Sequence, residues 1–152
     1  MNDWIKNPTF IYYTITCLIL TTNLLFLWVY SGFVRAKVKT TVNKEDASRF
    51  GGAAVTQTEP EPIARVLRAH TNAEANIYPF LFLGIIFVLA GGNATTAAII
   101  FGVFALARLL HSFAFLKGLQ PWRTIFFSIG ALATLVLMVD ITLMVIRVCL
   151  YN

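Results

Sequence analysis

IARVLRAHTNAEANIYPFLFLGIIFVLA, from Ile63 to Ala90, is the stretch that decides the fold. It opens with charged and polar side chains and becomes continuously apolar only at Ile77. The apolar part is therefore roughly 21 Å long at about 1.5 Å per helical residue. Because a bilayer's hydrocarbon core is about 30 Å thick, a spanning helix here must place polar turns at membrane depth. Charged groups at that depth are costly and normally face protein or water, which predicts a functional site inside a helix bundle.

Three further apolar runs have the length of membrane spans: residues 8–34, 94–116 and 121–148. The chain has 152 residues, of which 58% are hydrophobic, so there is no room for a separate soluble domain. The connections after the second span are tight, which makes sequential helices antiparallel neighbours. We therefore expect an all-α protein, with residues 1–152 forming a single integral membrane four-helix bundle of up-down topology. Its one sizeable loop covers residues 35–62.

The basic residues are distributed unevenly about the predicted spans. Most lie in the 35–62 loop and around the third connection, and few lie on the opposite side, so the positive-inside rule puts both loops in the cytoplasm and both termini outside it. The membrane itself is left open between a bacterial inner membrane and the endoplasmic reticulum. Within the loop, Asn43 before Glu45 and Asp46 is typical of a helix start, and a glycine pair follows, which predicts a short helix from Lys44 to Phe50.

Arginines gather on one side of the membrane in this topology. Up-down threading brings together the end of the first span, the start of the second, the end of the third and the start of the fourth. Inside the helices at that end, Glu74 is the only carboxylate that we expect. The arrangement predicts an anion site. Its arginines are Arg35, Arg65, Arg68, Arg108 and Arg123.

The second span carries two polar faces. At about 100° per residue, Arg65, Arg68, Asn72 and Asn76 fall within a sector of roughly 80°, and His70 with Glu74 lies nearly opposite. One helix cannot show either face to lipid, so we expect a homo-oligomer in which one face meets a neighbouring subunit. Plainer interpretations stay open: a packing pair for His70 and Glu74, a structural role for Arg108 on Glu74 or a backbone carbonyl, and helix–helix hydrogen bonds for His111 and Asn23.

The cysteines and acids predict no further chemistry. Cys17 and Cys149 lie in apolar helices, where a small buried residue needs no other role, and no spacing indicates a disulfide framework or a metal site. The net charge of +5 follows membrane topology and does not indicate nucleic-acid binding.

Several motifs in combination resemble one known family. The second span reads Arg65-Val-Leu-Arg68-Ala-His70-Thr-Asn72, followed by Asn76-Ile-Tyr78-Pro79-Phe80, and later come Ala107-Arg108-Leu-Leu-His111-Ser and Gln120-Pro121-Trp122-Arg123. Nearly the whole chain is similar to the membrane-associated proteins of eicosanoid and glutathione metabolism, the MAPEG family, and most similar to its microsomal glutathione transferase and prostaglandin E synthase branch. The resemblance implies a homotrimer that binds glutathione between subunits and receives lipophilic co-substrates from the bilayer.

The resemblance also implies roles for single residues. Arg123 would stabilise the glutathione thiolate and so act in catalysis. Glutathione itself would be held by Arg35, Asn72, His111 and Thr124, and its pocket would be shaped by Arg65, Arg68 and Arg108. Asp46 matches a loop acid that has been considered catalytic in the prostaglandin branch.

The chain departs from the family pattern at four positions. Ala75 stands where the family usually has a glutamate for the glutathione amino group, Thr71 replaces a basic residue, and Phe115 and Phe127 replace tyrosines. Prostaglandin synthesis is therefore not the expected activity. The function that we expect is a glutathione-dependent transferase or peroxidase for lipophilic electrophiles. The alternatives are a non-catalytic lipid- or anion-binding member of the family and a small multidrug exporter, although the first span lacks the carboxylate on which such exporters rely.

Overall fold

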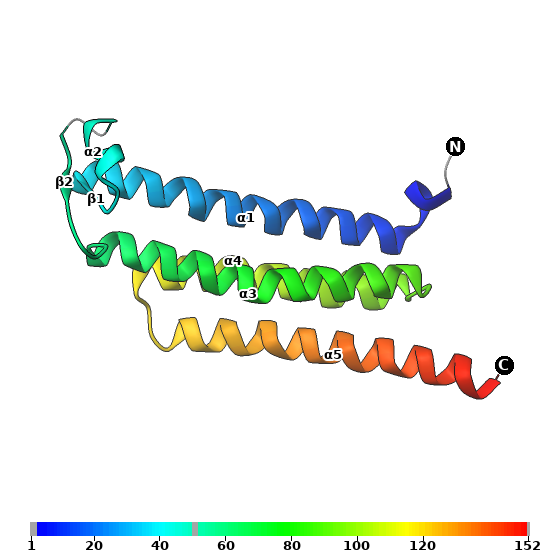
Figure 1. Ribbon diagram of the computed structural model, residues 1–152. Helices are drawn as coiled ribbons and strands as arrows, with labels where there is room; N and C mark the ends of the chain where they lie inside the picture. Colours follow the sequence, from blue (N-terminus) through cyan, green and yellow to red (C-terminus); the bar gives the residue numbers. More distant parts are fainter. Residues whose placement is uncertain (1–2, 50–51, 152) are drawn as a thin grey trace.

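The computed structural model describes residues 3–49 and 52–151, and these form a bundle of long helices (Figure 1). Within these residues four long helices run antiparallel in sequence: α1 (Pro8–Val38), α3 (Glu61–Leu89), α4 (Ala94–Lys117) and α5 (Trp122–Tyr151). A 3₁₀ turn, η1 (Asp3–Lys6), precedes them. Both termini lie at one end of the bundle, and the long loop lies at the other, which we call the loop end. The predicted all-α, up-down membrane bundle is confirmed.

The helix ends follow from local chemistry. Asn7 caps α1 by accepting a hydrogen bond from the Thr9 amide, and Asn93 caps α4 in the same way. The helix α1 continues four residues beyond the expected end because nothing breaks it before Lys39, whose φ of 53° is left-handed. The helix α3 begins at Glu61, two residues earlier than expected, since Pro62 is tolerated in a first turn.

The loop holds more structure than the sequence predicted. A short helix, α2, covers Lys44–Arg49, which agrees with the expected helix except at Phe50, a residue outside the described part of the chain. Two short strands, β1 (Thr40–Thr41) and β2 (Ala54–Val55), flank it and pair in parallel. This pairing ties the end of α1 to the segment that leads into α3.

The described helices α1, α3, α4 and α5 are all long and apolar enough to cross a membrane. The central pair, α3 and α4, separates α1 from α5: α1 packs on both, and α5 packs chiefly on α4 (Figure 1). The core that these helices share combines aliphatic side chains with phenylalanines, and the rings of Phe80 and Phe104 stack with centroids 3.5 Å apart. Because α5 leans mainly on α4, a hollow remains between α3, α4 and α5 at the loop end.

Candidate functional site

The hollow between α3, α4 and α5 is a cavity of about 440 Å³. Three helices supply its lining, two of them near their loop-end termini. The lining combines cationic, polar and aromatic side chains: Arg68, Asn72, His111, Phe115, Arg123, Thr124 and Phe127. The structure thus brings together five of the seven residues for which the sequence predicted a catalytic or binding role: Arg68, Asn72, His111, Arg123 and Thr124.

Arg108 lies behind this lining and holds Asn72 in place. Its side chain is fully buried, and its Nη2 donates to Asn72 Oδ1 at 2.8 Å and to the Asn72 carbonyl at 3.4 Å. Asn76 donates to the same carbonyl at 2.8 Å. Since the Asn72 oxygen is engaged by Arg108, the Asn72 amide can offer its N–H donors to a ligand. The alternative of a structural arginine on a backbone carbonyl describes this geometry well.

Arg123 is fixed on two sides at the start of α5. With its carboxamide oriented by its neighbours, Gln120 accepts from Arg123 Nη2 at 2.8 Å and from Nε at 3.2 Å, and donates to Thr124 Oγ1 at 3.1 Å. The guanidinium also lies over the Phe115 ring, 4.8 Å from its centroid. The Arg123 guanidinium is therefore held in a fixed orientation at the cavity. Among the described residues no carboxylate forms an ion pair with it.

His111 forms the aromatic floor of the cavity together with two phenylalanines. It is almost fully buried, with its ring centroid 5.7 Å from that of Phe115 and 6.1 Å from that of Phe127. Thr124 supplies a hydroxyl in the lining. Phe115 and Phe127, which stand where the family pattern has tyrosine, supply none. A bound molecule would therefore meet cationic, amide and hydroxyl groups next to apolar rings.

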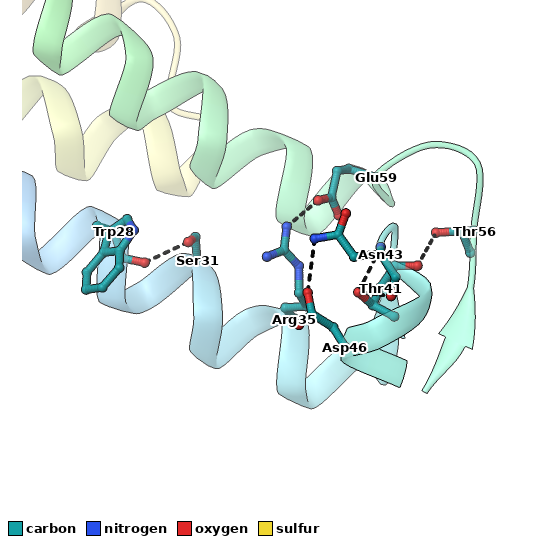
Figure 2. Close-up of polar contacts among 8 residues, drawn as sticks. All are labelled: Trp28, Ser31, Arg35, Thr41, Asn43, Asp46, Thr56 and Glu59. Carbon is teal, nitrogen blue, oxygen red and sulfur yellow. Dashed lines mark hydrogen bonds and ion pairs between the residues drawn. The ribbon is translucent and has the colours of Figure 1, made fainter. Parts of the chain in front are cut away.

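The other arginines at the loop end have carboxylate partners, which corrects one expectation. Figure 2 shows Arg35 paired with Glu59, close to Asn43 and Asp46, whose side chains are joined by a hydrogen bond of 3.0 Å. Arg65 and Arg68 both bind Glu61, at 3.2 and 2.9 Å. The expectation that Glu74 is the only carboxylate inside the helices at this end was wrong, because α3 begins at Glu61.

Arg35 and Arg108 do not line the cavity. Arg35 and Glu59 are both mostly buried beneath the loop, with side chains 24% and 19% exposed, and one nitrogen of Arg35 and one oxygen of Glu59 have no partner among the residues that the structure describes. Arg108 Nε and Nη1 likewise have none. These two arginines therefore lie at the loop end of the bundle without lining the cavity.

His70, Glu74 and Asn23 make the packing contacts that the sequence analysis kept as alternatives to a functional role. His70 Nδ1 lies 3.5 Å from Glu74, and the Tyr78 hydroxyl donates to Glu74 at 3.2 Å, so this face of α3 carries a polar cluster away from the cavity. Asn23 donates to Ser112 Oγ at 3.1 Å between α1 and α4, which is a helix–helix contact.

The sequence reasoning missed Gln120, Glu59 and Glu61. Gln120 was visible in the motif before Arg123, and its spacing of three and four residues to Arg123 and Thr124 is the signal that could have found it. Glu59 and Glu61 stand beside prolines in a stretch that was assigned to the loop. The spacing of Glu61 to Arg65 and Arg68, four and seven residues, is the helical signal that could have found this pair, whereas no periodic pattern links Glu59 to Arg35.

Comparison with known proteins agrees with this architecture. The family model described as "MAPEG family" matches residues 11–143. Among curated proteins, the chain is 40% identical to prostaglandin E synthase of Bos taurus over 105 residues, 68% of each chain. It is 34% identical to microsomal glutathione S-transferase 1 of Sus scrofa over 139 residues, which are 89% of this chain and 90% of that protein. The family match covers α3 and α4 entirely and most of α1 and α5, and the chain belongs to the MAPEG family.

Proposed function

We propose that this multi-pass membrane protein is a glutathione-dependent transferase or peroxidase that acts on lipophilic electrophiles. The observation that carries the proposal is the cavity in which Arg123, held by Gln120 and Phe115, faces amide and hydroxyl groups beside apolar rings. Relatives named as a glutathione transferase and a prostaglandin E synthase support the same class of chemistry.

The cavity suits glutathione in charge and in size. Glutathione carries two carboxylates and a net negative charge, and guanidinium groups pair with carboxylates through two parallel hydrogen bonds. The volume of the cavity, about 440 Å³, lies within the usual range for small-molecule sites. The Asn72 N–H donors and the Thr124 hydroxyl can bind the carbonyl and carboxylate oxygens of the peptide.

Arg123 is the residue to which we assign activation of the thiol. The thiolate is the reactive form of a thiol, and a nearby cation raises its fraction at neutral pH. Arginine keeps its charge under all physiological conditions, so it performs this task without itself becoming neutral. The thiolate attacks the electrophilic carbon of the second substrate, a sulfur–carbon bond forms, and the leaving group departs with its bonding electron pair.

Arg35 can contribute to the site only if it reaches the cavity of a neighbouring subunit. In one subunit it lies under the loop on α1, outside the cavity lining. We place it at the cavity of an adjacent copy in a homotrimer, where the exposed side of α1 covers the open side between α3 and α5. The trimer also buries the polar cluster of His70 and Glu74, which lipid would otherwise surround.

The departures at Ala75, Phe115 and Phe127 define how this site differs from its relatives. The cavity lining contains no carboxylate to bind the glutathione amino group and no phenolic hydroxyl to bind the sulfur. We therefore expect weak glutathione binding and a thiolate that depends on Arg123 more than on hydrogen bonds.

The test is calorimetric titration of the detergent-purified protein with glutathione, followed by a conjugation assay with chlorodinitrobenzene. Heat of binding together with product formation supports the proposal. Binding that is accompanied by neither the ultraviolet absorbance of a thiolate nor any product supports the alternative, a non-catalytic anion-binding member of the family. The absence of phenolic hydroxyls from the cavity lining is the observation that favours this alternative.

A further inference from the structure

A second hollow runs along the opposite side of α4 from the cavity, between α1 and α4. It consists of two adjoining spaces of about 810 and 580 Å³, which share Tyr30 and Leu116 in their walls. The deeper space is mainly apolar, with Thr22, Asn23 and Ser112 as polar groups partway along it, and it reaches along α1 as far as Leu18. The outer space opens at the loop end, between α1 and α3. None of the residues that line the cavity also lines this groove.

The groove has the length and surface of a site for a hydrocarbon chain. From Leu18 to Tyr30 the wall on α1 extends about 18 Å at roughly 1.5 Å per residue. One leaflet of a bilayer, half of a core of about 30 Å, has nearly this depth. Phe26, Tyr30 and Phe33 stack along the wall with centroids 5.6 and 6.5 Å apart, and so give a flat aromatic track.

The mouth of the groove is cationic. Lys117 lines the deeper space near its outer limit, and Lys37 and Arg65 line the outer space. Glu61 also lies there, but both Arg65 and Arg68 bind its carboxylate. Neither lysine forms an ion pair within residues 3–49 and 52–151. An apolar track that ends at two free ammonium groups is complementary to an anionic amphiphile.

We propose that this groove binds one anionic phospholipid of the surrounding bilayer. Its acyl chain lies along the aromatic track, and its phosphate contacts Lys37 and Lys117 at the mouth. The bilayer supplies this ligand at high local concentration, and basic pockets between membrane helices are suited to anionic headgroups. Because α4 separates the groove from the cavity, lipid and cavity ligand bind together without competing.

The test counts lipids bound to the whole protein by native mass spectrometry. The purified chain is equilibrated in neutral detergent micelles that contain equal amounts of phosphatidylglycerol and phosphatidylcholine. We expect preferential retention of phosphatidylglycerol and at least a tenfold loss of that preference in the Lys37→Gln/Lys117→Gln variant, since each basic residue near a charged surface contributes about fivefold. The control is Lys6→Gln/Lys44→Gln, which makes the same charge change at exposed positions away from the groove.

A second pair of variants tests the track itself. Thr22 is exposed in the groove, and its hydroxyl donates to the Leu18 carbonyl, one turn earlier. Thr14 makes the same bond to Phe10 elsewhere on α1. Thr22→Trp should displace the lipid, and Thr14→Trp should not. Equal retention of the two phospholipids by the unmodified protein, or retention that neither the lysine double variant nor Thr22→Trp reduces, would overturn the proposal.

Discussion

Replacement of Arg123 by leucine should abolish most of the turnover of the proposed enzyme and leave its assembly intact. The side chain is partly buried, bonded to Gln120 and stacked on Phe115, so leucine fills similar space and frees only a glutamine that already contacts Thr124. The change therefore removes a cation from the cavity lining and disturbs little of the packing.

The magnitude follows from the charge that is lost. A thiolate about 6 Å from the guanidinium interacts with it by roughly 2.8 kcal/mol at an effective dielectric constant of about 20. For a thiol that is otherwise mostly protonated at neutral pH, this energy raises the thiolate fraction by up to about 100-fold. We therefore expect turnover to fall by about 10²-fold, a cost of about 2.7 kcal/mol in the transition state, while glutathione affinity falls only modestly.

The assay is conjugation of chlorodinitrobenzene across a pH series, with thiolate absorbance measured in parallel. Loss of the cation raises the thiol pKa of bound glutathione, so the deficit of Arg123→Leu should shrink as the pH increases. Arg147→Leu is the matched control, because it removes an exposed arginine from the same helix at the far end of the bundle. Full turnover in Arg123→Leu, or a deficit that does not vary with pH, would refute thiol activation by this residue.

Three further predictions concern architecture and packing. Native mass spectrometry in mild detergents should find trimers, and monomers alone would contradict the burial of two polar faces of α3. Reporter fusions at Gly52 and Gly92 should give opposite signals, with Gly52 in the cytoplasm, and matching signals would contradict the topology. Gly118→Ala should lower the melting temperature, because its φ of 68° is left-handed and the new Cβ would lie 2.6 Å from Arg65 Nη1; Gly102→Ala, which meets nothing within 4 Å, should not lower it.

The fold could be predicted because it depends on a property that the sequence shows directly. Apolar runs long enough to span a bilayer must become helices, and tight connections make them antiparallel. The loop was less predictable: the pairing of Thr40–Thr41 with Ala54–Val55 involves four residues that no periodic pattern marks. The ends of α1 and α3 were misjudged because charged residues were assigned to the loop, although nothing in them breaks a helix.

The site could be predicted in part for a similar reason. Arg68 and Asn72 are four residues apart, so they share a face of any helix, and antiparallel threading brings that face to His111 and Arg123. Ion pairs such as Arg35 with Glu59 depend instead on how a loop folds back over a helix end. Helical periodicity carries no information about that contact.

The contacts of the arginines are the basis on which we assign one of them to act on a ligand. Arg35 pairs with Glu59, whereas Arg65 and Arg68 share the single carboxylate of Glu61, so these ion pairs offset two of the three positive charges at the loop end. In the described part of the chain Arg108 has no carboxylate partner, but it is fully buried behind Asn72 and orients that side chain. Arg123 lines the cavity, partly exposed, with only neutral groups holding it. Arg68 and Arg123 both line the cavity, but of these two only Arg68 pairs with a carboxylate among the described residues, and we assign activation of the thiol to Arg123.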